Sequence, residues 1–124
     1  MTRARLEILQ WFGLLGGALA WAGQHVLGYF FADAGCNVAG SQWGLDLTPM
    51  QIVLSLAAAA VVLAAEAAAF IVYRETRTVD EYAPGPNGRL KFFAEAALLG
   101  NVLFFVIVVL DCISTVYHLP CLQS

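Results

Sequence analysis

Five polar side chains interrupt the long apolar stretches of this chain, and their types suit hydrogen bonding or proton transfer. They are Gln24, His25, Glu66, Glu95 and Asp111. An ionisable group at the depth of a membrane costs about 2.5–3.5 kcal/mol on insertion scales, so such groups rarely face lipid. If the apolar stretches are membrane helices, we expect all five side chains to make polar contacts inside the membrane.

Two of the five, Glu66 and Glu95, lie in the parts of their apolar stretches that are nearest to the segment 74–89. They could approach one another there, or pair with Arg74 and Arg89, whose long side chains reach inward along a helix. One interpretation makes the glutamates a proton relay. The other makes them protonated or hydrogen-bonded links between helices or to a partner subunit. We favour the links.

The other three, Gln24, His25 and Asp111, lie toward the opposite ends of their stretches, and we expect them to cluster. Ser114 and His118 follow Asp111 at spacings of three and four residues, so they share its helix face. His25 is a candidate ligand for haem b, with His118 as the one other histidine, or a candidate contact for a quinone. We favour an interhelical hydrogen bond for His25, and we predict no cofactor and no metal site.

Two of the three cysteines, Cys36 and Cys121, each follow the end of an apolar stretch on the same side of the expected membrane. Thiols outside the cytoplasm are oxidised in most cells, so we predict a Cys36–Cys121 disulfide. In the chain-entropy model, closing a loop of this length stabilises a fold by on the order of 4 kcal/mol. Two free or metal-binding thiols are the alternative, which we disfavour because neither cysteine belongs to a Cys-x-x-Cys pair. Cys112 is expected to fill space as a small apolar residue.

The elements that position these residues are three apolar runs, at residues 8–31, 50–73 and 90–117. Each reaches the roughly 20 residues that a helix needs to cross the hydrocarbon core. Hydrophobic residues make up 60% of the chain and charged residues 12%, which is far less charge than a soluble chain of this size exposes. The sequence therefore predicts an all-α integral membrane protein, a three-helix bundle that forms a single domain over residues 1–124.

The basic residues all lie beside the N-terminus or beside the segment between the second and third runs. They are Arg3, Arg5, Arg74, Arg77, Arg89 and Lys91. By the positive-inside rule, the N-terminus and a loop at 74–89 are cytoplasmic, while a loop at 32–49 and the C-terminus lie outside. We expect a multi-pass protein of a bacterial inner membrane.

Small residues and a capping pattern indicate how the first two helices begin and pack. Thr48 and Gln51 fit a capping box, which predicts that the second helix begins just after Thr48. Its body, LAAAAVVLAAEAAAF, is rich in alanine, and the first run carries a face of small residues that includes Gly13, Gly17 and Gly28. Small residues on both helices favour a closely packed pair.

The stretch EILQWFGLLGGALAWAGQHVLGYFF, followed by Cys36 and by a second cysteine near the C-terminus, resembles a group of small three-span bacterial membrane proteins. These proteins accompany cytochrome c oxidase and related respiratory components. The most recognisable elements of the resemblance are Trp21, Gln24, His25, Gly28 and Tyr29. The resemblance implies a respiratory association, but it carries over no catalytic residues.

The expected function is that of an accessory or structural subunit of a larger respiratory or electron-transfer membrane complex, such as an oxidase assembly. We expect no catalysis by the chain itself, since the sequence contains no catalytic motif. Orientation in the membrane explains the few basic residues, so we expect no nucleic-acid binding; the expected partners are other subunits and lipids. Two alternatives stay open: a small proton-coupled transporter, and a membrane redox subunit that binds haem or quinone.

Overall fold

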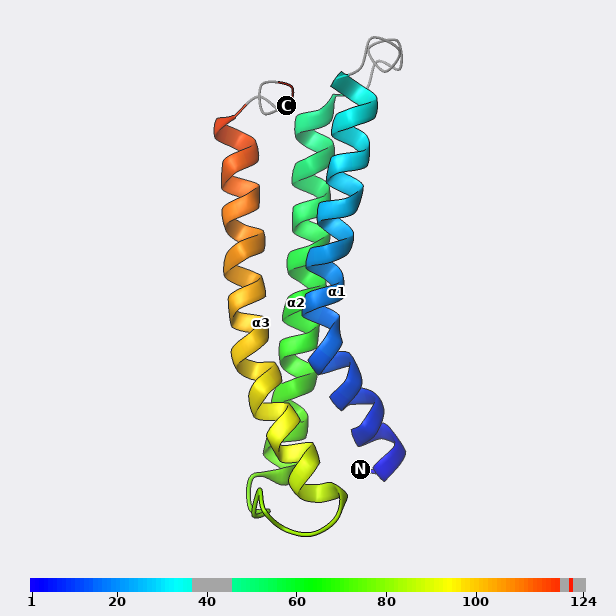
Figure 1. Cartoon of the computed structure of the whole chain (residues 1–124), viewed down its shortest axis with the longest axis vertical. Coiled ribbons are helices and arrows are strands. Elements are labelled where there is room, and N and C mark those ends of the chain that lie inside the picture. The colour runs from blue at the N-terminus through cyan, green and yellow to red at the C-terminus, as the bar shows by residue number, and fades with distance from the viewer. Residues whose placement is uncertain (37–45, 119–120, 122–124) are drawn as a thin grey trace.

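The computed structural model describes residues 1–36, 46–118 and 121, and it consists of three long helices. α1 (Arg3–Cys36), α2 (Leu47–Thr76) and α3 (Pro86–Tyr117) contain 34, 30 and 32 residues. They run alternately up and down, so each helix is antiparallel to the next one in the chain (Figure 1). The described residues contain no strand, and the predicted all-α, three-helix architecture is confirmed.

The two ends of the bundle differ in chemistry. The N-terminus and the connection between α2 and α3 lie at one end (Figure 1), which we call the basic end because it holds all six lysines and arginines of the chain. At the other end, which we call the disulfide end, Cys36 at the end of α1 is bonded to Cys121. The S–S distance is 2.08 Å and the Cα–Cα distance is 5.4 Å. The structure therefore contains the predicted disulfide.

Two of the described helices, α2 and α3, are long and apolar enough to cross a membrane. Their most apolar 18-residue windows have mean hydropathies of 2.2 and 2.5. α1 does not meet the same criterion, because glutamines, a histidine and several glycines interrupt its apolar residues. A membrane crossing by α1, and the orientation of the bundle in a membrane, therefore stay predictions.

Close packing of α1 against α2 depends on small residues in both helices. Gly13 and Gly16 of α1 are buried. A methyl group placed on Gly13 would lie 3.0 Å from the backbone nitrogen of Ala69, and one placed on Gly16 would lie 3.0 Å from Cβ of Ala65. These glycines therefore let the two helix backbones approach.

The small-residue face of α1 extends less far than the sequence suggested. Gly17 is buried against α3, where its missing side chain leaves room for the amide oxygen of Asn101. A Cβ atom at Gly28, by contrast, would meet no neighbouring atom within 4 Å. Gly28 lines a cavity instead of a packed interface.

α2 begins earlier than predicted. Asp46 is its N-cap, and the Asp46 carboxylate accepts a hydrogen bond of 3.3 Å from the backbone N–H of Thr48. The predicted capping box of Thr48 and Gln51 is therefore wrong, since both residues lie inside the helix. Aspartate is as good an N-cap as threonine, and the earlier start buries Leu47 against Gly35 of α1.

The connection between α2 and α3 is shorter than the predicted loop at 74–89, because both helices extend into it. Lys91 in the first turns of α3 donates a hydrogen bond of 3.1 Å to the carbonyl of Val79, and its Nζ lies 4.0 Å from a carboxylate oxygen of Glu81. Gly85 has a φ of 108°, which favours glycine, and it leads directly into α3. The connection is thus a compact turn that is tied back to α3.

Candidate functional site

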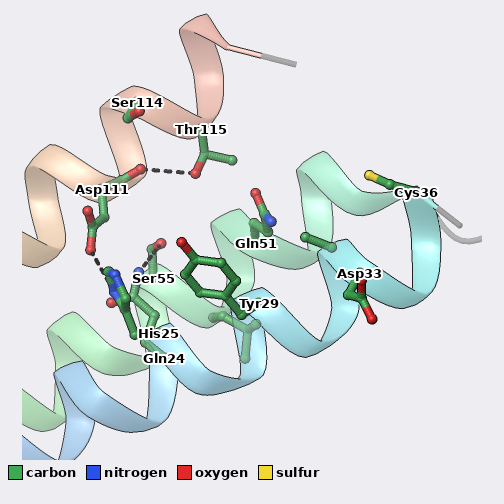
Figure 2. A pocket seen from close by; sticks show the side chains of 13 residues that line it. Gln24, His25, Tyr29, Asp33, Cys36, Gln51, Ser55, Asp111, Ser114 and Thr115 are labelled. Atoms are coloured by element: carbon green, nitrogen blue, oxygen red, sulfur yellow. Dashed lines mark hydrogen bonds and ion pairs between the residues drawn. The ribbon is translucent and has the colours of Figure 1, made fainter. Parts of the chain in front are cut away.

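A cavity of about 570 Å³ lies among the three helices at the disulfide end (Figure 2), and we call it the polar cavity. All three helices contribute polar side chains to its wall. These are Gln24, His25, Tyr29 and Asp33 of α1, Gln51 and Ser55 of α2, and Asp111, Ser114 and Thr115 of α3. The structure thus brings together three of the five polar residues singled out in the sequence, and the other two, Glu66 and Glu95, do not line this cavity.

His25 and Asp111 face one another across the cavity, one from α1 and one from α3 (Figure 2). His25 Nδ1 lies 3.5 Å from Asp111 Oδ2, which is longer than the roughly 2.7–3.2 Å of an ordinary N–H···O hydrogen bond. The two side chains are 44% and 33% exposed, so neither is sealed from the cavity. This histidine–carboxylate pair is the group of the site best suited to hold or move a proton.

Gln24 links α1 to α2 at the floor of the cavity. Its Nε2 donates a hydrogen bond of 3.0 Å to the hydroxyl of Ser55, which is 2% exposed (Figure 2). The amide must therefore point its oxygen, Oε1, away from Ser55. This orientation decides what the cavity offers to a ligand, because the oxygen of a carboxamide can only accept hydrogen bonds.

Two acceptor atoms of the cavity are buried and have no hydrogen-bond partner among the described residues: Gln24 Oε1 and Asp111 Oδ2. Most buried polar atoms in proteins are paired, so two such atoms in one site need an explanation. The backbone carbonyl of Asp111 is occupied, since it accepts a hydrogen bond of 2.9 Å from the hydroxyl of Thr115. Among the described residues, the contact of the Asp111 carboxylate is the long one of 3.5 Å between Oδ2 and His25 Nδ1.

Two aromatic side chains of α1 pack on either side of the imidazole of His25. Trp21, His25 and Tyr29 follow one another at intervals of four residues, which places them on one helix face. Ring centroids are 5.3 Å apart between Trp21 and His25, and 6.1 Å apart between His25 and Tyr29. Trp21 also lies 5.9 Å from the ring of Phe104 on α3. The imidazole is therefore flanked by rings on both sides along α1.

His118, the other histidine, has a different role. Its Nδ1 lies 3.3 Å from the backbone carbonyl of Ser114 on its own helix, and the residue is the C-cap of α3. It does not line the polar cavity. Among the described residues, no group of three or more histidine, cysteine, aspartate or glutamate side chains is arranged to hold a metal ion.

Glu66 belongs to a second polar cluster, which lies in the middle of the bundle. Its carboxyl group interacts with the side chain of Asn101 from α3, while its Oε2 is buried without a hydrogen-bond partner in the described structure. Asn101 is 1% exposed and donates a hydrogen bond of 2.8 Å to the carbonyl of Gly13 on α1. This cluster therefore connects all three helices.

The second glutamate of the expected inner pair, Glu95, is half-buried on α3. The described residues include no hydrogen bond or ion pair for its side chain, and the partner that Glu66 has is Asn101. The structure therefore does not join the two glutamates into a relay.

Two residues that matter here, Ser55 and Asn101, escaped the sequence analysis because they are uncharged residues inside apolar runs. A signal for each was nevertheless present. Apart from Ala68, the buried residues of α2 recur at alternating intervals of three and four from Ser55 onward, and those of α3 do so from Leu90 through Ala94 and Ala97 to Asn101. A polar residue at such a position is expected to contact a neighbouring helix.

Comparison of the chain with protein-family models, with curated proteins and with solved structures found no match. The functional interpretation therefore depends on the residues and on their arrangement.

Proposed function

We propose that the chain is a three-span protein of a bacterial inner membrane and an accessory subunit of a larger respiratory or electron-transfer complex, such as an oxidase assembly. It has no catalytic activity of its own. Its N-terminus is cytoplasmic and its C-terminus lies outside.

Exposed apolar side chains on all three helices support the membrane location. Examples are Leu19 of α1, Leu63 of α2 and Leu103 of α3, whose side chains point away from the bundle and are 67%, 54% and 65% exposed. A soluble monomer rarely exposes such extended apolar faces. Lipid or a partner helix would cover these apolar side chains and remove them from water.

The distribution of charge supports the orientation. Every lysine and arginine of the chain belongs to the basic end, and the described part of the disulfide end carries the acidic residues Asp33 and Asp46. Basic residues remain on the cytoplasmic side of inner-membrane proteins. The Cys36–Cys121 disulfide then faces the oxidising side, where it is stable.

The observation that carries the role of a subunit is the apolar surface that all three helices leave exposed. Phe30 of α1, Leu56 of α2 and Leu99 of α3 are 58%, 62% and 74% exposed. Helices associate inside a membrane by close packing of such surfaces. A chain of three helices therefore leaves large helix faces free for the helices of a partner.

The proposal is tested by gentle solubilisation of the affinity-tagged chain from its native membrane, followed by identification of the proteins that co-purify. We expect subunits of a respiratory complex in a fixed ratio to the tagged chain. The same tag on an unrelated three-span protein serves as the control. Recovery of the tagged chain by itself, as one monodisperse species, contradicts the proposal.

Glu66 supports one alternative, a small proton-coupled transporter, because one oxygen of its carboxyl group, Oε2, is buried inside the bundle. Reconstitution of the purified chain in liposomes separates this alternative from the proposal. A transporter gives proton-coupled uptake that is lost in Glu66→Gln and is kept in the matched variant Glu95→Gln. An accessory subunit gives no such uptake, either as the wild type or as one of these two variants.

A further inference from the structure

A second cavity lies at the basic end, where α1 leans away from α2 toward its N-terminus (Figure 1). Its volume is about 400 Å³, and we call it the basic hollow. The residues that line it are Met1, which precedes α1, and Ile71, Arg74, Glu75 and Arg77 at the end of α2. Two guanidinium groups and one carboxylate give the α2 side of the hollow a net positive charge.

The two arginines of the basic hollow are available to an anion. Arg74 and Arg77 are three residues apart, so they share a helix face, and both are exposed. Among the described residues, neither side chain makes an ion pair or a hydrogen bond, in contrast to Lys91, which contacts Glu81. A ligand of the hollow must therefore bring negative charge.

The depth of the hollow in a membrane follows from the length of α2. Its 30 residues span about 45 Å at 1.5 Å per residue, which is about the thickness of a bilayer with its head groups included. If α2 crosses the membrane, Arg74 in its last turn lies at the level of the lipid phosphates. Phe70 and Ile71, one turn deeper, are 50% and 38% exposed at the level of the acyl chains.

We propose that the basic hollow binds an anionic phospholipid. Arg74 and Arg77 hold its phosphate group, and an acyl chain packs along Ile71. The proposal rests on the membrane location proposed above, but it does not depend on any partner complex.

The chemistry of the hollow selects among the phosphates that a cell offers. The planar guanidinium group of arginine donates two parallel hydrogen bonds to phosphate oxygens. The ammonium group of phosphatidylethanolamine would be repelled by the two arginines, whereas phosphatidylglycerol carries only the negative charge. Inorganic phosphate has no acyl chain to contact Phe70 and Ile71, so the combination of charge and apolar surface favours a lipid.

Binding is measured on the purified full chain, freed of lipid, in micelles of a neutral detergent. Phosphatidylglycerol and phosphatidylethanolamine with identical acyl chains are titrated separately, and native mass spectrometry gives the dissociation constant of the first bound lipid. Inorganic phosphate is added as a competitor of phosphatidylglycerol.

We expect phosphatidylglycerol to bind at least fivefold more tightly than phosphatidylethanolamine, since each basic residue near a membrane surface contributes about that factor toward an anionic lipid. Equal affinity for the two lipids overturns the proposal. Displacement of phosphatidylglycerol by an equimolar amount of inorganic phosphate shows a site for the free ion and also overturns it. These outcomes do not bear on co-purification with a complex, so the two proposals fail separately.

Variants locate the lipid. Arg74→Gln and Arg77→Gln should each weaken the binding of phosphatidylglycerol about fivefold, and the double variant about twentyfold. The matched control is the double variant Arg5→Gln and Arg89→Gln. It removes the same charge from two other exposed arginines of the basic end, neither of which lines the hollow.

The control double variant should change the affinity less than twofold. All four arginines are exposed, so we expect every variant to fold, and helix content verifies it. The single variants make the result independent of the double one. Equal weakening in the two double variants shows that the lipid responds to the overall charge of the basic end, and it overturns the assignment to the basic hollow.

Discussion

Substitution of single glycines in α1 tests the packing of the bundle quantitatively. In Gly13→Ala, the new Cβ atom would lie 3.0 Å from the backbone nitrogen of Ala69 and 3.1 Å from its Cα. Backbone atoms cannot rotate away, so α1 and α2 must separate slightly. Gly23→Ala is the matched control, because a Cβ atom at Gly23 meets no neighbouring atom within 4 Å.

The difference between the two variants isolates the packing contribution. Overpacking of a well-packed interface destabilises a protein by about 1–3 kcal/mol. Replacement of glycine by alanine inside a helix also stabilises the helix, by about 0.8–1.0 kcal/mol, and this gain is common to both variants. We therefore expect the free energy of unfolding of Gly13→Ala to be about 1–3 kcal/mol lower than that of Gly23→Ala.

The assay is reversible unfolding of the purified chain in mixed micelles with increasing denaturing detergent, followed by circular dichroism. Wild type, Gly13→Ala and Gly23→Ala are compared under one condition. We expect Gly23→Ala to be at least as stable as wild type. If Gly13→Ala is as stable as Gly23→Ala, α1 and α2 are not in the close contact described here.

Three further predictions address topology, the disulfide and the central polar cluster. The topology is tested in a background in which Cys112, the cysteine within α3, is replaced by alanine. Tyr82→Cys in the α2–α3 connection should react with a membrane-impermeant thiol reagent only after the cells are permeabilised, whereas Pro49→Cys should react in intact cells. The reverse pattern refutes the orientation. Cys36→Ser should lower the stability of the chain by up to about 4 kcal/mol, since the disulfide closes a separation of 85 residues, and unaltered unfolding would show that the bond does not constrain the chain. Asn101→Leu should lower the free energy of unfolding by about 1–3 kcal/mol, because it removes the hydrogen bond to α1, while the exposed neighbour variant Val102→Leu should leave it within about 0.5 kcal/mol of wild type.

The helices and the disulfide could be predicted from the sequence because each depends on local or one-dimensional information. Long apolar runs indicate helices, and the charge pattern placed Cys36 and Cys121 on one side of the expected membrane. The start of α2 was predicted wrongly because two cap residues compete there. Asp46 prevails over Thr48 through a tertiary contact, the burial of Leu47, which no local pattern contains.

The polar cavity could be predicted only in part. Depth along the helices indicated that Gln24, His25 and Asp111 lie near one another, but it did not indicate a cavity. The sequence could not show that Gly28 lies beside open space and not against packed atoms, because this depends on the spacing of the helices at the disulfide end. The partner of Gln24, Ser55, was missed because a serine in an alanine-rich run carries no charge to mark it.

The central claim, that this chain is one subunit of a larger membrane complex, is tested most directly by native mass spectrometry of the tagged chain released from its own membrane. The account predicts an assembly well above the 13.3 kDa of the chain, with respiratory subunits identified among its dissociation products. A mass equal to the chain alone, or to a multiple of it, would contradict the claim.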